Sequence, residues 1–159
     1  MLDVAVIGGS GYAGGEAVRL LLDHPEANLR QVTSERLAGK FVRSVHPNLR
    51  KRTDLKFIPL DQLQPCDVLF IALPHGVAMG KMAALREKAP IIIDLSADFR
   101  LNDPAGYPKW YDHEHTEQGM LGDFIYGIPE LHREEIKTAN AISSAGCMAT
   151  TAILGLYPL

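Results

Sequence analysis

Cysteine is scarce in this chain of 159 residues, which holds only Cys66 and Cys147. Two cysteines so far apart do not make the disulfide framework of a small secreted domain, so we expect reduced thiols. No apolar run approaches the roughly 20 residues that a membrane-spanning helix needs. We see no apolar secretory leader, internal repeat or low-complexity segment either. These absences predict a soluble, cytoplasmic protein without a membrane partner.

Positive charge is not in excess. Sixteen Lys and Arg residues stand against 19 Asp and Glu residues, which gives a formal net charge of −3. Because there is no basic stripe, the sequence predicts no general affinity for nucleic acid or for anionic membranes. The length fits about one ordinary domain with a substantial core.

A glycine-rich turn lies close to the start of the chain. Residues 2–7 predict a buried strand, and the apolar positions of residues 16–23 have helical spacing. Between a strand and a helix, glycines permit a tight turn and let backbone N–H groups approach a pyrophosphate. A structural turn without a ligand is the alternative. Two registers of the dinucleotide-binding pattern fit: Gly9, Gly11 and Gly14, or Gly8, Gly11 and Gly14.

The second predicted strand, residues 29–33, leads into Ser34, Glu35 and Arg36. An acidic residue at this place usually binds the ribose 2′-hydroxyl of NAD, whereas an arginine can hold the 2′-phosphate of NADP. Both types are present here. Arg36 and the Ser34 hydroxyl offer a charge-assisted phosphate site, which slightly favours NADP. A solvated loop is the alternative.

Further strands are predicted at residues 55–58, 67–73 and 91–95, with a helix at residues 77–88 between the last two. Strands that alternate with helices are typical of a parallel sheet. The sequence therefore predicts an α/β fold with a doubly wound, mostly parallel, Rossmann-type sheet.

The loops after two of these strands carry His75 and Arg100. Ligands of such sheets bind beyond the carboxyl ends of the strands, so both loops are candidate walls of the site. His75 either contacts the dinucleotide or caps a turn. Arg100 either receives an anionic substrate or pairs with Asp98. Asp94 and Asp98 resemble an acid/base pair, but capping is the commoner role for a carboxylate at a strand end.

Residues 102–122 predict an irregular excursion, in which Trp110 and Tyr111 anchor the segment by burying aromatic area. His113-Glu114-His115 superficially resembles a metal cluster. Without a Cys pair or a His-x-x-x-His helix we predict no metal site there. A short helix at residues 129–136 and a strand at residues 140–143 follow.

Cys147 follows Gly146 at the turn that this last strand makes into a helix. A helix that begins near Met148 would direct its free N–H groups and positive dipole end at the sulfur, which favours the nucleophilic thiolate. The alternative is a buried, structural cysteine, the role that we expect for Cys66.

Six blocks occur in order along the chain, at residues 8–15, 33–40, 72–76, 94–101, 126–131 and 146–147. Together they resemble the N-acetyl-gamma-glutamyl-phosphate reductase family over essentially the whole chain. Aspartate-semialdehyde dehydrogenase is a more distant relative with the same chemical logic.

The resemblance implies that an acyl phosphate is reduced with NADPH. Cys147 is similar to the family's nucleophile, whose thioester accepts the hydride to give a semialdehyde. Arg100 matches an arginine near the substrate, and His75 is a further candidate for the cofactor. The remaining matches are to the pyrophosphate loop, at Ser10, Gly11, Tyr12 and Ala13, and to the 2′-phosphate segment, at Ser34, Glu35 and Arg36.

The residues around Cys147 indicate a branch of the family. Arginine-pathway enzymes commonly have Asn-Pro-Gly-Cys-Tyr-Pro-Thr, whereas this chain has Ser-Ala-Gly-Cys-Met-Ala-Thr at residues 144–150. This segment and residues 46–50 are more similar to the lysine-pathway branch. Its substrates are aminoadipyl or glutamyl phosphates whose amine is attached to a small acidic carrier protein. Reduction of the N-acetylated glutamyl phosphate of arginine biosynthesis is the alternative.

Family members are roughly twice as long as this chain, so the resemblance implies that an α+β domain follows residue 159. That domain would carry the acid/base histidine and the interface of a homo-oligomer. We divide the chain into an NADP-binding domain, residues 1–146, and a nucleophile-bearing helix, residues 147–159. We expect the chain alone to bind NADP and to catalyse poorly. A non-catalytic nucleotide-binding module with a structural cysteine is the alternative from another class.

Overall fold

The computed structural model describes all residues 1–159 and contains one sheet of seven strands in the order β3-β2-β1-β4-β5-β7-β6. Every paired neighbour is parallel. The strands are β1 Leu2–Ile7, β2 Ala27–Thr33, β3 Phe57–Ile58, β4 Val68–Ile71, β5 Ile91–Asp94, β6 Ile125–Gly127 and β7 Ala141–Ser144. The prediction of a doubly wound Rossmann-type sheet is confirmed, and the sheet is parallel throughout.

Six α-helices and four short 3-10 helices connect the strands. The α-helices are α1 Tyr12–Leu21, α2 Val42–Val45, α3 Met82–Arg86, α4 Gly106–Tyr111, α5 Pro129–Thr138 and α6 Cys147–Leu156. The 3-10 helices are η1 Pro47–Leu49, η2 Leu60–Gln62, η3 Met79–Lys81 and η4 Gln118–Asp123. No helix is both long and apolar enough to span a bilayer.

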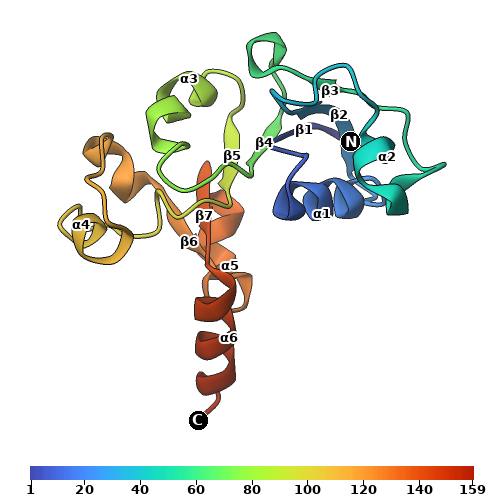
Figure 1. Cartoon of the computed structure of the whole chain (residues 1–159). Helices are drawn as coiled ribbons and strands as arrows, with labels where there is room; N and C mark the ends of the chain where they lie inside the picture. Colours follow the sequence, from blue (N-terminus) through green and yellow to red (C-terminus); the bar gives the residue numbers. More distant parts are fainter.

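The two faces of the sheet bury separate hydrophobic cores. On one face, Val4 and Val6 of β1 pack with Val18 of α1. On the other, the alternate residues Ala5 and Ile7 of β1 pack with α3. Because successive side chains of a strand point to opposite faces, β1 is buried on both sides. Figure 1 shows α1 and α3 on opposite sides of the sheet.

The register of the sheet places the carboxyl ends of its central strands at one level. Asp94, the last residue of β5, pairs with Ile71 of β4 on one side and with Ser143 of β7 on the other. The loops that leave these strands, and the glycine-rich turn after β1, therefore begin along the same edge.

The prediction that a helix spans residues 77–88 is wrong at the start of that range. Residues 74–78 form a loop, and the helical segment begins as η3 and continues as α3. The Asp98 carboxylate accepts hydrogen bonds from the backbone N–H groups of Gly76, at 2.7 Å, and Met79, at 2.9 Å. These bonds from a distant segment fix a loop where apolar periodicity alone suggested a helix.

The prediction that Trp110 anchors the excursion is also wrong. Its side chain is 67% exposed, with the Lys109 ammonium 4.5 Å from the ring centroid. The buried anchor is Tyr107, whose hydroxyl donates a 2.6 Å hydrogen bond to the Asp98 carbonyl oxygen. Tyr111 is half-buried against the same core. The excursion also contains α4 and η4, which we did not predict.

Helix α6 projects away from the rest of the protein (Figure 1). None of its residues is buried, although the helix is largely apolar. Met148 and Leu156 are among the most exposed apolar side chains of the chain.

Candidate cofactor and nucleophile site

The turn after β1 requires glycine for reasons of space. Gly8 has a φ of +74°, and a Cβ there would lie 2.3 Å from the Ala72 oxygen. A Cβ on Gly14 would lie 2.4 Å from the Gly8 oxygen, and one on Gly9 would lie 2.1 Å from Cγ1 of Val32. Gly8 thus makes the tight turn, whereas Gly9 and Gly14 let helix and strand approach. Each of the two predicted registers contains glycines that the structure requires.

The turn presents free backbone donors. Gly11 is the N-cap of α1, and the N–H groups of Tyr12, Ala13 and Gly14 have no acceptor within the protein. Three such groups at a helix N-terminus form an anion site. The Tyr12 side chain is fully exposed.

The Ser10 hydroxyl joins this turn to the segment after β2 through a 2.9 Å hydrogen bond to the Ser34 hydroxyl. A pocket of about 360 Å³ opens beside the pair and is lined by Ser34, Glu35 and Arg36 among others. The Glu35 carboxylate accepts a 2.9 Å hydrogen bond from the Leu60 N–H. The structure therefore brings together the residues that we predicted around the adenosine end of a dinucleotide.

Sequence reasoning missed one histidine at this turn. The His46 Nε2 atom lies 2.8 Å from the Gly9 carbonyl oxygen, which can only accept, so Nε2 carries the proton. His46 lies in the connection that follows β2, between α2 and η1. Its only signal in the sequence was membership of the family-like segment 46–50.

His75 caps a neighbouring turn, and one side of its ring stays free. Nδ1 of His75 accepts a 2.9 Å hydrogen bond from the Ala97 N–H. The neutral ring therefore carries its proton on Nε2. Because His75 is exposed, that N–H is available to a ligand at the carboxyl edge.

Asp94 and Asp98 are both capping residues, as the sequence suggested. Asp94 accepts hydrogen bonds from the Ser96 N–H and hydroxyl, and burial raises the pKa of Asp94 to about 6. Asp98 uses its carboxylate on the amides of Gly76 and Met79. The suggested pairing of Asp98 with Arg100 is wrong, because Arg100 binds backbone carbonyls.

Arg100 braces the turn that carries the nucleophile candidate. Its Nε donates to the Ser144 oxygen at 2.9 Å, and Nη2 donates to the Leu95 oxygen at 3.1 Å. Its Nη1 lies 3.1 Å from where a Cβ of Gly146 would stand. A pocket of about 250 Å³ borders Arg100 and Gly146. A fixed guanidinium beside a pocket suits an anionic group.

Cys147 is exposed and is the first residue of α6, with Gly146 as the N-cap. The N–H groups of Cys147, Met148 and Ala149 have no acceptor within the protein. Cys147 therefore lies at the helix N-terminus where we expected it from the sequence. The helix begins one residue earlier than the sequence suggested.

Cys66 has a different setting. Its thiol is half-buried, and its Sγ donates a 3.4 Å hydrogen bond to the Val68 oxygen. Burial raises the pKa of Cys66. These features describe a structural thiol.

The histidines of the metal-like segment bind the protein's own backbone. His115 is buried, its Nε2 donates to the Asp98 oxygen at 2.6 Å, and its Nδ1 accepts from the Glu117 N–H at 3.1 Å. Burial lowers the pKa of His115. His113 donates through Nδ1 to the Tyr111 oxygen at 2.7 Å.

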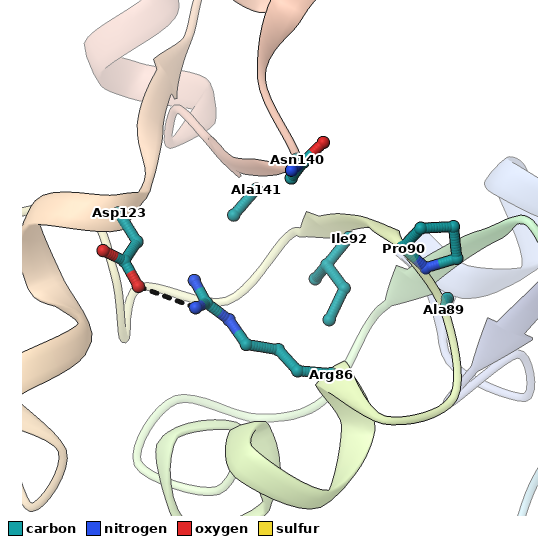
Figure 2. A pocket seen from close by; sticks show the side chains of 7 residues that line it. All are labelled: Arg86, Ala89, Pro90, Ile92, Asp123, Asn140 and Ala141. Carbon is teal, nitrogen blue, oxygen red and sulfur yellow. Dashed lines mark hydrogen bonds and ion pairs between the residues drawn. The ribbon is translucent and has the colours of Figure 1, made fainter.

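Another pocket, of about 410 Å³, lies at the opposite edge of the sheet, where β5 and β7 begin. Figure 2 shows Arg86 reaching across it to Asp123, with 2.6 Å between Nη1 and Oδ2. None of the predicted site residues lines this pocket. We assign the site to the carboxyl edge because the glycine turn, His75, Arg100 and Cys147 meet there.

Curated relatives are similar over the whole chain. A protein of Thermomicrobium roseum with the provisional name [LysW]-L-2-aminoadipate 6-phosphate reductase is 58% identical over 100% of this chain and 45% of its own length. The [LysW]-L-2-aminoadipate 6-phosphate reductase of Deinococcus radiodurans is 51% identical over 98% of this chain and 45% of its own. An N-acetyl-gamma-glutamyl-phosphate reductase of Acinetobacter baumannii is 48% identical over 100% of this chain and 46% of its own. The chain thus spans about half the length of these relatives.

Solved structures share the fold. Aspartate semialdehyde dehydrogenase II from Vibrio cholerae superposes with a TM-score of 0.69 at 18% identity, over 99% of this chain and 46% of that chain. The Candida albicans aspartate semialdehyde dehydrogenase, solved with NADP, gives a TM-score of 0.66 at 18% identity, over 99% of this chain and 46% of that chain. Residues 3–139 match the family described as "Semialdehyde dehydrogenase, NAD binding domain". With the glycine turn and the parallel sheet in place, the chain belongs to this family of NAD-binding domains of semialdehyde dehydrogenases.

Proposed function

We propose that this chain supplies the NADPH-binding domain, residues 1–146, and the nucleophile-bearing helix, residues 147–159, of an acyl phosphate reductase of amino-acid biosynthesis. The position of Cys147 carries the proposal. It is an exposed thiol at a helix N-terminus, and it follows β7 at the same edge of the sheet where the glycine turn follows β1. A nucleophile and a dinucleotide seat on one edge suit a reaction that joins covalent catalysis to hydride transfer.

The residues present fit a phosphorylated dinucleotide. The free amides of Tyr12, Ala13 and Gly14 suit the pyrophosphate, and Arg36 suits the 2′-phosphate. The Glu35 carboxylate, which would bind the ribose of NAD, accepts the Leu60 amide at Oε1 and keeps acceptor capacity. The choice of NADP over NAD therefore rests on Arg36.

In the proposed reaction, the Cys147 thiolate attacks the acyl carbon, the C–O bond to phosphate breaks, and inorganic phosphate leaves. NADPH, when bound, supplies the hydride that reduces the resulting thioester. The C–S bond then breaks, which releases the semialdehyde and restores the thiolate. Arg100 would receive an anionic group of the substrate from its position beside Gly146.

We propose a carrier-linked 2-aminoadipyl 6-phosphate as the substrate, with a small acidic carrier protein as the partner. The names of the relatives from T. roseum and D. radiodurans support this choice. The relative from A. baumannii, at 48% identity, favours the second candidate, N-acetyl-gamma-glutamyl phosphate. Assaying both substrates with the longer polypeptide, including a C-terminal half like that of these relatives, separates the two.

Thiol labelling tests the nucleophile. At neutral pH, iodoacetamide should modify Cys147 faster than Cys66, because a helix N-terminus activates one and burial raises the pKa of the other. Cys66→Ser and Cys147→Ser isolate each thiol. Equal slow labelling of both would favour a nucleotide-binding module with an inert cysteine.

Calorimetric titration tests the cofactor. NADPH should bind more tightly than NADH, and Arg36→Ala should remove the difference. No preference in the unsubstituted chain would mean that Glu35 governs the site and that NAD is the cofactor.

A further inference from the structure

The pocket beside Ser34 has two walls from distant parts of the chain. One wall, the segment after β2, contributes Arg36, and the other, the segment after β4, contributes Val77 and Lys81. Leu60 of η2 also lines the pocket. The sequence had pointed only to the first wall.

The two cations that line this pocket, Arg36 and Lys81, have no acidic partner. Both are exposed, and neither takes part in an ion pair. Five other arginines, in contrast, pair with carboxylates: Arg19, Arg30, Arg43, Arg52 and Arg86. The pocket therefore holds two cations that form no ion pair, together with one carboxylate, Glu35, whose Oε1 accepts the Leu60 N–H.

We propose that Lys81 is the second cation for the adenosine 2′-phosphate, which it holds together with Arg36 in the pocket that both residues line. The inference rests on the proposed use of NADP. A 2′-phosphate carries up to two negative charges, so two cations neutralise it where one leaves charge uncompensated. The Ser34 hydroxyl lines the same pocket and adds a neutral donor.

The backbone beneath Lys81 is fixed, although its ammonium group is free. Asp98 holds the amide of Met79, and the Lys81 N–H donates to the Ala78 oxygen at 3.0 Å. Met79 and Met82, on either side, are buried. The backbone at Lys81 is therefore ordered before a ligand binds. Binding then costs only the conformational entropy of the Lys81 side chain.

Lys81→Gln tests the proposal in calorimetric titrations of the 159-residue chain. The probes are NADPH and NADH, and adenosine 2′,5′-bisphosphate and 5′-AMP, pairs that differ at the 2′-phosphate. We expect Lys81→Gln to weaken the binding of NADPH and of the bisphosphate about tenfold. The affinities for NADH and 5′-AMP should change by no more than about twofold. Lys109→Gln, which removes the same charge from α4, should change none of the four.

The alternative outcomes are distinct. An equal loss for NADPH and NADH would overturn the proposal, because Lys81 would then contact a part common to both. Unchanged binding of all four probes would overturn it as well. If the unsubstituted chain does not prefer NADPH to NADH, the proposal that NADP is the cofactor is wrong. Circular dichroism and thermal unfolding of Lys81→Gln establish that the variant is folded.

Discussion

The His46 ring lies so close to Gly15 that a Cβ on Gly15 would stand 2.3 Å from Cε1 of the ring. The same ring donates a hydrogen bond to the Gly9 oxygen. His46 thus contacts both the glycine turn and the helix that follows it. One side chain from the connection after β2 fixes the direction in which α1 leaves the turn.

Gly15→Ala should therefore destabilise the fold, although alanine is the better helix former. Either the ring must move and lose its bond to Gly9, or the helix must shift, and overpacking of this kind costs roughly 1–3 kcal/mol. Urea unfolding measures the loss. Gly155→Ala is the matched control, because Gly155 lies in α6 with open space around it, and this variant should be neutral or slightly stabilising.

The double substitution of His46→Ala with Gly15→Ala separates the clash from other effects. Removal of the ring should restore part of the stability that Gly15→Ala loses. A Gly15→Ala protein as stable as the unsubstituted chain would contradict the close contact.

Removal of the Asp98 carboxylate provides a second test, because this carboxylate holds the loop before η3. Asp98→Ala should lower the free energy of unfolding by roughly 1–3 kcal/mol, since two backbone N–H groups lose their acceptor and that of Met79 is buried. Hydrogen exchange should accelerate at the amides of Gly76 and Met79. Asp112→Asn, at an exposed position whose positive φ asparagine tolerates, controls for the loss of one charge. Unchanged protection of both amides in Asp98→Ala would refute this role.

The pH dependence of stability tests Asp94. Its pKa is raised from 3.8 to about 6, so the folded state binds the proton more tightly than the unfolded state does. The contribution of Asp94 to stability is therefore present below about pH 4 and is lost as the pH rises toward 6. The two pKa values correspond to a loss of roughly 3 kcal/mol.

Asp94→Asn should remove this part of the pH profile. The free energy of unfolding of the unsubstituted chain, relative to that of the variant, should fall between pH 4 and pH 7, as measured by urea unfolding at several pH values. Asp112→Asn provides the exposed comparison. A constant difference between the chain and Asp94→Asn across this range would show that Asp94 does not titrate there.

The effect of Arg100 on the nucleophile candidate can be tested through the reactivity of Cys147. Arg100→Met removes the donors to Ser144 and Leu95 and the positive charge beside Gly146. We expect alkylation of Cys147 to slow by about tenfold, or about 1.4 kcal/mol. Arg133→Met, on an exposed position of α5, should leave the rate unchanged. Equal rates in the two variants would limit Arg100 to a role in substrate binding.

The parallel sheet and its edge were predictable because their signals are local. The glycines directly follow the apolar run at residues 2–7, and Ser34, Glu35 and Arg36 directly follow β2. Each of these two signals therefore lies within a few residues of the sequence. Since every strand is parallel, identifying a strand also predicts which edge its following loop reaches. His75, Arg100 and Cys147 were placed correctly by this rule.

The errors arose where distant contacts override local pattern. Asp98 turns the start of an apparent helix into a loop, and Tyr107 takes the buried place expected for Trp110. β6, with three residues that include Gly127, has too little sequence to read as a strand. Lys81 shares a pocket with Arg36 across a separation of 45 positions, which no spacing rule reveals.

The exposed helix α6 has a consequence for the thiol at its first residue. A helix of ten residues without a buried side chain is only marginally stable in water, and its dipole lasts only while the helix is formed. A partner surface that covers Met148 and Leu156 would therefore also sharpen the field at Cys147. Any contact that stabilises α6 would thus be thermodynamically coupled to the field at its first residue.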